Sequence, residues 1–539
     1  MLRLLLAAAG DERNRIVLAT IAAGVAMGAV LAVVNTVTEY DKNASAQVTL
    51  IGVFILSCAT FLYAKSYALN GTARVVEALL DRTRTRFAEK IRRADMRSIE
   101  GLQRRIAVTL PRDTQTLSEA GTIIVHGFSS GVMLCFSAFY VATLSLLAFA
   151  ITIVLFGSAV YFYKRSQERS ADILRSAAQA DTQFYNAFLN LLNGFKEVKI
   201  STARGDDLQE NYIATLSEAT HHHRVASAQR FNAGANITNF FFYLLMGVLV
   251  FGLPQNEDSA EVAAKVINVV IFVGSAIEIV LRALPMLARA NFAIDNLEEL
   301  ERKLDAADEK AAESTAKDAP VLKEGISCRM ISYSYFDPAG QPLFSVGPLD
   351  LEIKAGEVLF IVGGNGSGKS TLLRLVTRLY EPQSGVMMWD GRRVDQSNLT
   401  DYRNLFSAIF SDFHLFDRLY GLDGVDPDTV QGLLERMQLQ HKTRYEDGRF
   451  SEINLSTGQR KRLALLTTLL EGKQISIFDE WAADQDPEFR KYFYEVLVPE
   501  WRSQGKTLVI VSHDDRYFHV ADRVIFMEDG RTVERSLAE

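Results

Sequence analysis

Six apolar stretches in the N-terminal half constrain the fold of this chain more than any other feature of its sequence. About twenty apolar residues in a helix cross the hydrocarbon core of a bilayer, and the stretches are of about that length. The first is too long for a secretory signal and shows no obvious small-residue cleavage site. The pattern predicts an α-helical transmembrane domain with six spans. The candidate spans are 16–37, 47–64, 121–140, 143–163, 236–254 and 262–286.

The third and fourth spans come from one uninterrupted apolar run. Between Gly121 and Tyr163 the chain contains no Asp, Glu, Lys or Arg, and its one histidine is His126. A run of this length is too long for a single span. It therefore predicts two spans joined by a tight turn.

The distribution of Lys and Arg predicts how the spans are oriented. Basic residues are frequent in 65–118 and 164–235, whereas the connections near 38–46, 141 and 255–261 carry almost none. Loops rich in Lys and Arg stay on the cytoplasmic side. We therefore expect both long loops and both termini in the cytoplasm of a bacterium, with the chain in the inner membrane.

Both long loops resemble continuations of the membrane helices. They contain few Pro or Gly residues, and apolar side chains such as Phe184, Phe188 and Leu191 recur at helical spacing. A nucleic-acid partner is not expected, because these basic charges flank membrane spans and the whole chain carries a formal charge of −7.

Composition divides the 539 residues into three parts. The chain is 48% hydrophobic, which is high for a soluble enzyme and low for a protein that lies entirely in the membrane. A segment rich in Glu, Lys, Asp and Ala cannot build a packed core, so we interpret it as a linker that is helical at its start. The predicted division is a membrane domain at 1–296, the linker at 297–323 and a second domain at 324–539.

The three cysteines are too far apart to suggest a disulfide framework or a zinc site. We interpret Cys58, Cys135 and Cys328 as packing residues.

The second domain contains a glycine-rich phosphate-binding motif in a credible context. An apolar strand at 358–362 leads into the motif, and a helical pattern follows it. Backbone N–H groups of such a loop surround phosphates, and the helix N-terminus adds positive potential. Lys369 is expected to reach the β- and γ-phosphates of ATP, and the Ser370 hydroxyl to ligate Mg²⁺. The predicted cofactor-binding residues of the loop are Gly363, Gly364, Asn365, Gly366, Ser367, Gly368, Lys369, Ser370 and Thr371.

A second apolar strand, 475–478, ends in two carboxylates. Asp479 at the strand end suits coordination of Mg²⁺, and Glu480 is placed to polarise the attacking water. A solvated acidic strand end is the alternative interpretation, which the phosphate motif upstream makes weaker.

The motif set resembles that of the ABC ATPase family. Residues 455–459, LSTGQ, resemble the family signature LSGGQ with Thr457 in place of a glycine, about twenty residues before Asp479. The resemblance implies that Ser456, Thr457, Gly458 and Gln459 bind nucleotide. It also implies a switch histidine at His513, in contact with the γ-phosphate, and adenine stacking by Tyr335.

Two segments depart from the family pattern. Residues 483–486, ADQD, match the D-loop only loosely. The glutamine expected in the loop that faces the membrane domain is replaced by Ser411, next to Asp412, which could substitute for it.

The resemblance implies an α/β nucleotide-binding domain and an ATPase coupled to export. In the family, two ATP molecules are bound between two such domains, so one domain per chain implies a homodimer. Short helices near 93–100 and 190–199 are expected to carry motion to the spans, and the second resembles the segment that reaches the partner subunit.

The cargo is less constrained. FSDFHLFDRL in the second domain and GFKEVKI in the second cytoplasmic loop are similar to the cyclic-peptide and siderophore exporters, of the syringomycin and pyoverdine-precursor type. This favours a small peptide-like substrate. A lipid or lipid-linked saccharide flippase is the alternative; an importer subunit and a regulatory ABC protein without transport fit less well.

Three ionisable residues in the spans are candidates for cargo contact, because charges inside a membrane are often functional. They are Glu278, Arg282 and His126, although Glu278 and Arg282 lie four apart and could simply pair. The triplet 221–223, three consecutive histidines, suggests a metal site, but consecutive helical residues point in different directions.

Overall fold

The computed structural model describes residues 10, 12–37, 44–167, 170–252, 257–312, 320–337, 339–422 and 424–533. The chain divides into two compact units, which are treated separately below. The first consists of Met1–Phe87 and Arg105–Glu301, and the second of Ala88–Arg104 and Arg302–Glu539. The segment Ala88–Arg104, from the first cytoplasmic loop, thus groups with the C-terminal part of the chain.

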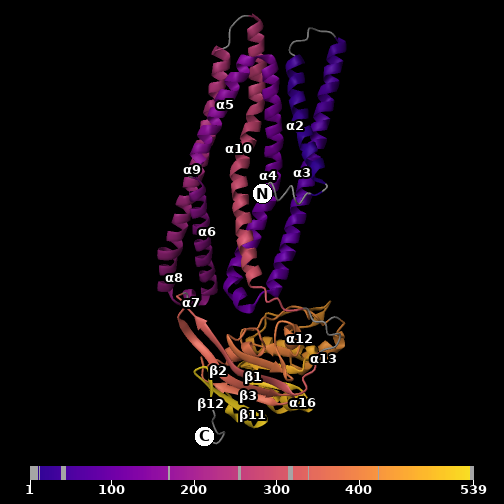
Figure 1. Ribbon diagram of the computed structural model, residues 1–539, viewed down its shortest axis with the longest axis vertical. Helices are drawn as coiled ribbons and strands as arrows, with labels where there is room; N and C mark the ends of the chain where they lie inside the picture. The colour runs from indigo at the N-terminus through magenta and orange to yellow at the C-terminus, as the bar shows by residue number, and fades with distance from the viewer. Residues whose placement is uncertain are drawn as a thin grey trace. The chain divides into compact units, whose positions relative to one another are not determined.

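The described part of the first unit is built from helices joined by short turns (Figure 1). Helices α3, α4 and α10 also extend into the second unit. The elements are α2 (Glu12–Val37), α3 (Ala44–Arg93), α4 (Met96–Leu144), α5 (Leu146–Gln167), α6 (Ser170–Asn193), α7 (Phe195–Ile200), α8 (Thr202–Asp207), the π-helical turn η1 (Leu208–Ile213), α9 (Ala214–Gly252) and α10 (Glu257–Ala306).

Six of these helical segments are long and apolar enough to cross a membrane, which confirms the predicted six spans. The tight turn between the third and fourth spans lies at Ser145, between α4 and α5. Residues 253 and 254 of the fifth expected span, and the connecting residues 38–43 and 255–256, lie outside the described part of the chain.

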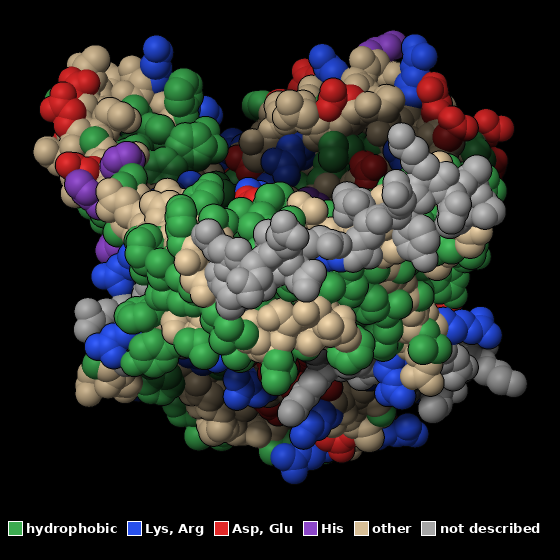
Figure 2. All heavy atoms as spheres, turned by 90° about the horizontal axis from the view of Figure 1, so that it is seen from above, with side chains coloured by type: hydrophobic (Ala, Val, Ile, Leu, Met, Phe, Trp, Pro, Cys, Tyr) green, Lys and Arg blue, Asp and Glu red, His purple; other side chains and the backbone are tan. Residues whose placement is uncertain are grey.

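Small residues inside this unit and large apolar ones outside it suit a bilayer. A Cβ atom on Gly28 would lie only 2.0 Å from the Phe136 ring, so glycine allows α2 and α4 to approach closely. Leu56 and Phe139 are exposed on their helices. Seen from above in Figure 2, hydrophobic side chains cover much of the middle of the face.

The interpretation of the cysteines as packing residues is only partly right. Cys328 is buried, Cys58 is half-buried, and Cys135 is exposed on its helix. Cys135 lies in a span and lines an apolar cavity of the first unit, so an apolar residue is acceptable there without full burial.

A cavity of about 250 Å³ lies among α4, α5, α9 and α10 of the first unit. Its walls are almost entirely apolar. The hydroxyls of Thr152 and Thr238 donate to carbonyls of their own helices, whereas the buried Ser137 Oγ finds no partner among the described residues. A guest in this cavity would therefore contact an almost entirely apolar surface.

The second unit is an α/β domain, as the sequence predicts. Its central sheet has the order β12-β11-β3-β10-β9-β6, parallel except for the edge strand β12. An antiparallel sheet has the order β2-β1-β4-β5. The strands are β1 (Gly325–Phe336), β2 (Pro342–Lys354), β3 (Val358–Gly363), β4 (Ser384–Trp389), β5 (Arg392–Arg393), β6 (Phe406–Ile409), β7 (Tyr445–Glu446), β8 (Arg449–Phe450), β9 (Ile475–Asp479), β10 (Thr507–Val511), β11 (Arg523–Glu528) and β12 (Arg531–Val533).

Helices and short turns cover the central sheet and complete two apolar clusters. The central strands β9 and β10 are mostly apolar in sequence, because both faces of each strand are buried. The elements are α11 (Lys369–Val376), α12 (Leu399–Arg403), α13 (Pro427–Arg436), α14 (Thr457–Glu471), η2 (Trp481–Asp484), α15 (Pro487–Tyr492), η3 (Phe493–Leu497), α16 (Val498–Ser503) and η4 (Asp515–Val520).

The segment Ala88–Arg104 makes specific contacts inside this second unit. Arg97 donates to the Tyr333 hydroxyl at 3.0 Å, and the Tyr380 hydroxyl donates to Glu100 at 2.9 Å. The rings of Tyr333 and Tyr380 are stacked, with centroids 4.9 Å apart. These contacts attach the junction of α3 and α4, where a coupling helix is expected, to the α/β domain.

Candidate functional site

The phosphate-binding motif forms a loop between β3 and α11. Two of its glycines adopt the left-handed conformation, with φ of 80° at Gly366 and 99° at Gly368, which other residues adopt only with strain. The Lys369 ammonium is buried and donates to the carbonyls of Gly363 at 2.8 Å and Gly364 at 3.0 Å. A buried ammonium beside a helix N-terminus makes this loop a site for a phosphate group.

The next component is a carboxylate at the carboxyl end of β9, an interior strand of the central sheet. In the parallel register, Val511 of β10 is level with both Ile361 of β3 and Asp479 of β9, so the ends of these strands meet. Asp479 is 1% exposed, and neither of its carboxylate oxygens has a hydrogen-bond partner among the residues that the structure describes. A buried charge left unpaired is unfavourable. Together with the Ser370 hydroxyl on α11, this carboxylate fits a hard cation such as Mg²⁺.

Glu480 lies beside the phosphate loop and the predicted switch histidine. Its Oε1 atom is 2.9 Å from His513 Nε2 and 3.8 Å from Lys369 Nζ. The structure thus brings together three residues, the first and last of which lie more than 140 positions apart in the sequence. A carboxylate in this position can accept a proton from a water molecule next to a bound phosphate.

The backbone of Glu480 is itself unusual. Its φ of 51° and ψ of 34° place it in the left-handed region, which costs a residue with a side chain about 1–2 kcal/mol. Such conformations persist where surrounding contacts hold them, often at functional sites. The contacts around the following turn, 481–486, are therefore part of the site.

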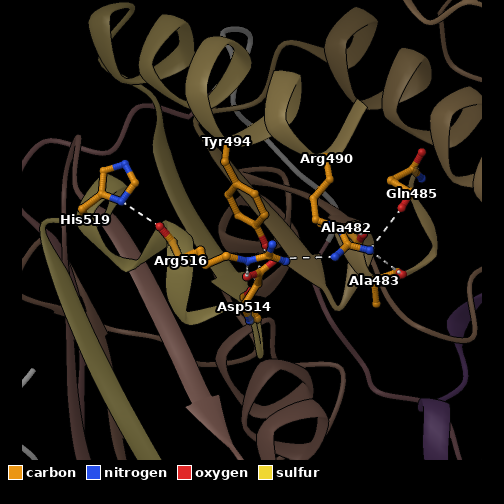
Figure 3. Close-up of polar contacts among 9 residues, drawn as sticks. Ala482, Ala483, Gln485, Arg490, Tyr494, Asp514, Arg516 and His519 are labelled. Carbon is orange, nitrogen blue, oxygen red and sulfur yellow. Dashed lines mark hydrogen bonds and ion pairs between the residues drawn. The ribbon is translucent and has the colours of Figure 1, made fainter. Parts of the chain in front are cut away.

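Arg490 holds that turn from the side of α15 (Figure 3). Its guanidinium donates to the carbonyls of Ala482 and Ala483, each at 3.2 Å, and of Gln485 at 3.1 Å. It also lies 3.4 Å from the carboxylate of Asp514, the residue after His513. Sequence reasoning missed Arg490, because no local motif marks it.

The loop that carries His513 has a second anchor. Tyr494 donates to the Ser512 hydroxyl at 2.8 Å. Burial raises the pKa of Tyr494 to about 12, so the phenol stays protonated and can donate at any physiological pH. Arg516 adds a contact to Asp514 at 3.0 Å (Figure 3).

The signature residues form the exposed start of α14. Ser456 is the N-cap, and its backbone N–H donates to the Gln459 side chain at 3.3 Å. Thr457, the first helical residue, is exposed. A Cβ atom on Gly458 would lie 2.5 Å from the Asp484 carbonyl, so this glycine is required where the helix meets the turn after Glu480.

Tyr335 lies near the phosphate loop. Its hydroxyl is 3.2 Å from the Thr371 hydroxyl, and its ring packs edge-on against Tyr333. Ser411 is exposed in the loop after β6. The neighbouring Asp412 pairs with Arg374 of α11 at 2.9 Å.

The candidate cargo residues lie in the first unit. Glu278 and Arg282 form an ion pair of 2.6 Å along α10, and both side chains are exposed. His126 is half-buried on α4. His222 is 3.6 Å from Glu218. Within the described ranges, no three His, Cys, Asp or Glu side chains are arranged so that they could hold a metal ion.

Comparison with known proteins decides the family. The family model described as ABC transporter matches residues 346–483. The ATP-binding protein SyrD of Pseudomonas syringae pv. syringae is 33% identical over 517 residues, which cover 93% of this chain and 90% of SyrD. This chain belongs to the ABC transporter family. It is an ABC exporter half-transporter, with one membrane domain followed by one ATPase domain.

Two further similarities agree with this assignment. The glutamine transport ATP-binding protein GlnQ of Escherichia coli is 34% identical over 198 residues, which cover 34% of this chain and 82% of GlnQ. The fold matches a solved structure described as a bacterial Atm1-family ABC exporter with ATP bound, with a TM-score of 0.75. That match has 19% identity and covers 99% of this chain and 95% of the other. The exporter therefore hydrolyses ATP and couples the reaction to transport across a membrane.

Proposed function

We propose that this exporter moves a cyclic or otherwise modified peptide, or a siderophore precursor, out of the bacterial cytoplasm as a homodimer. The observation that carries the proposal is the similarity to SyrD, which extends over 93% of the chain, membrane half included. The segments FSDFHLFDRL and GFKEVKI, which resemble the cyclic-peptide and siderophore branch of exporters, support it.

The residues of the ATP site receive distinct roles. Lys369 binds the β- and γ-phosphates, and Tyr335 contacts the adenine. Ser370 and Asp479 hold Mg²⁺, which neutralises charge on the phosphate oxygens. Glu480 polarises the attacking water, and His513 contacts both Glu480 and the γ-phosphate. Ser456 and Gly458 engage the ATP of the partner subunit, which accounts for the exposed start of α14.

The dimer is supported by unpartnered apolar residues on α7. Phe195 is 56% exposed and Ile200 is 88% exposed, on a short helix between α6 and α8. Isolated apolar side chains on a surface are common, but a short helix with two of them suits docking to another protein. We assign α7 as the coupling helix that contacts the partner subunit's ATPase domain.

Replacing Ile200 by Asp is expected to reduce ATP-driven transport at least about tenfold. Burial of an isoleucine side chain contributes about 1.5–3 kcal/mol, and a tenfold effect corresponds to about 1.4 kcal/mol. ATPase activity should stay within about threefold of the wild type, because α7 lies outside the ATP site. The assay is uptake of a cyclic lipopeptide by inside-out vesicles. Val496→Asp, on an exposed residue of η3, is the matched control, and normal transport by the Ile200 variant would contradict the assignment of α7.

The exposed ion pair on α10 supports a route for polar cargo. Glu278 and Arg282 lie in a span, and charged side chains in a membrane normally face a polar interior or water. We therefore place this pair toward the translocation path of the dimer, and His126 is the weaker third candidate. Both termini are assigned to the cytoplasm.

One observation favours a second candidate, a lipid or lipid-linked saccharide flippase. The cavity among α4, α5, α9 and α10 is apolar, partly open, and has a volume of about 250 Å³. A closed engineered cavity of about 150 Å³ already binds benzene, so this partly open space has room for a larger apolar group. The acyl chain of a lipid would suit these apolar walls, and so would the fatty-acid tail of a lipopeptide.

Reconstituted vesicles distinguish the two candidates. With ATP outside, the proposed exporter should accumulate a cyclic lipopeptide inside the vesicles and show at least about twofold stimulation of ATPase by it. A fluorescent phospholipid and a polyprenyl-linked sugar should show neither effect. Transport of either lipid without transport of the peptide would replace the first candidate by the second.

A further inference from the structure

A lysine of the signature helix reaches the backbone of the catalytic turn. Lys461 lies on α14, one turn after Gly458, and its side chain is 5% exposed. Its ammonium donates to the backbone carbonyl of Glu480 at 2.7 Å and lies 2.6 Å from the Asp484 carboxylate. The ammonium therefore links Glu480 to Asp484 of the turn that follows it.

A second contact joins the same two segments in the opposite direction. The indole N–H of Trp481 donates to the backbone carbonyl of Lys461 at 2.9 Å, and Trp481 is 1% exposed. Two hydrogen bonds thus join α14 to residues 480–481, one from the Lys461 side chain and one to the Lys461 backbone carbonyl. A displacement of α14 at this point must displace the backbone of Glu480.

The attachment matters because Glu480 adopts a left-handed conformation, with φ of 51°. Within the described chain, two further backbone contacts of this residue are long, at 3.2 Å from its N–H to Val511 and at 3.4 Å from the Ala483 N–H to its carbonyl. A contact from a charged donor is shorter and stronger than one between neutral groups. The ammonium of Lys461 is the closest donor to the Glu480 carbonyl.

We propose that Lys461 is a positioning residue for ATP hydrolysis, which holds the Glu480 carboxylate in place through its backbone carbonyl and thereby links it to the signature helix. Asp484 fixes the ammonium by pairing with it. The inference rests on the proposed role of Glu480. Because the start of α14 is assigned to the partner's nucleotide, the link makes hydrolysis in one site responsive to occupancy of the other.

The test uses the full-length exporter and separates turnover from binding. Lys461→Met keeps the length of the side chain and removes its charge and its donors. Because a misplacement of about 1 Å can lower a rate about a hundredfold, kcat is expected to fall about ten- to a hundredfold. The KM for ATP and the affinity for a fluorescent ATP analogue should stay within about threefold. Lys461→Arg, which keeps the charge, should recover most of the activity.

Two combinations distinguish positioning from a general structural role. Asp484→Asn should lower kcat less than Lys461→Met, and the double variant should be no worse than Lys461→Met alone, since both act through one contact. In a Glu480→Gln background, Lys461→Met should leave the residual turnover unchanged, because Lys461 acts through Glu480. Lys491→Met, which removes an exposed lysine of α15, is the control that should change nothing.

Several outcomes would overturn the proposal. The first is a kcat for Lys461→Met within about twofold of the wild type. The second is a further fall in turnover when Lys461→Met is added to Glu480→Gln. The third is a loss of ATP binding by Lys461→Met that parallels a loss of thermal stability. Normal hydrolysis by Glu480→Gln alone would instead remove the assignment of Glu480, whatever the Lys461 variants do.

Discussion

Alanine in place of Lys369 is expected to lower ATP affinity at least about a hundredfold and to reduce ATP turnover to background. The ammonium is 5% exposed and is held by the carbonyls of Gly363 and Gly364, so it is already directed into the phosphate loop. Hydrogen bonds to charged groups contribute about 1.5–3 kcal/mol each. Loss of contacts to two phosphates therefore corresponds to two or more factors of ten.

Binding of a fluorescent ATP analogue and release of inorganic phosphate measure the two effects separately. Lys369→Arg keeps the charge but changes its shape, and it should retain more affinity than the alanine variant. Lys491→Ala, in an exposed ion pair of α15, is the control for loss of one positive charge. Unchanged ATP turnover in Lys369→Ala would refute the assignment of the ATP site, provided that a thermal melt shows a folded protein.

The residues of the site that lie within one continuous sequence motif could be predicted from the sequence. The strand, the glycine-rich loop and the helix of 358–376 form a local unit, so each residue type is determined by its immediate neighbours. The six spans were equally predictable, because length and apolar composition alone decide whether a helix can cross a bilayer.

Contacts between distant segments could not be predicted in the same way. A lysine on a helix is normally assigned to the solvent face, and only the packing of α14 against the turn after Glu480 buries Lys461. Nor does glutamate favour a positive φ, so the strained backbone at Glu480 appears only when the surrounding contacts are known. Arg490 is a similar case, since its partner Asp514 lies 24 positions away.

The second large effect is expected from Glu480→Gln, which should bind ATP normally but hydrolyse it about a hundred- to a thousandfold more slowly. Glutamine has nearly the same shape but cannot accept a proton from water, and general-base catalysis contributes typically about 10²–10⁴-fold. The contact to His513 at 2.9 Å can persist with the amide, and the phosphate loop is untouched. The variant should therefore fold normally and retain ATP after removal of free nucleotide, whereas the wild type releases ADP.

Nucleotide retention and single-turnover hydrolysis are the deciding measurements for this variant. Glu495→Gln, which neutralises an exposed carboxylate in the same domain, should behave like the wild type. Near-normal hydrolysis by Glu480→Gln would show that another group activates the water. Asp412 is then the next candidate, because it follows β6, which pairs with β9, and because its carboxylate is held by Arg374 of α11. A slow variant that also fails to bind ATP would instead indicate that Glu480 supports the nucleotide site as a whole, through its 3.8 Å contact to Lys369.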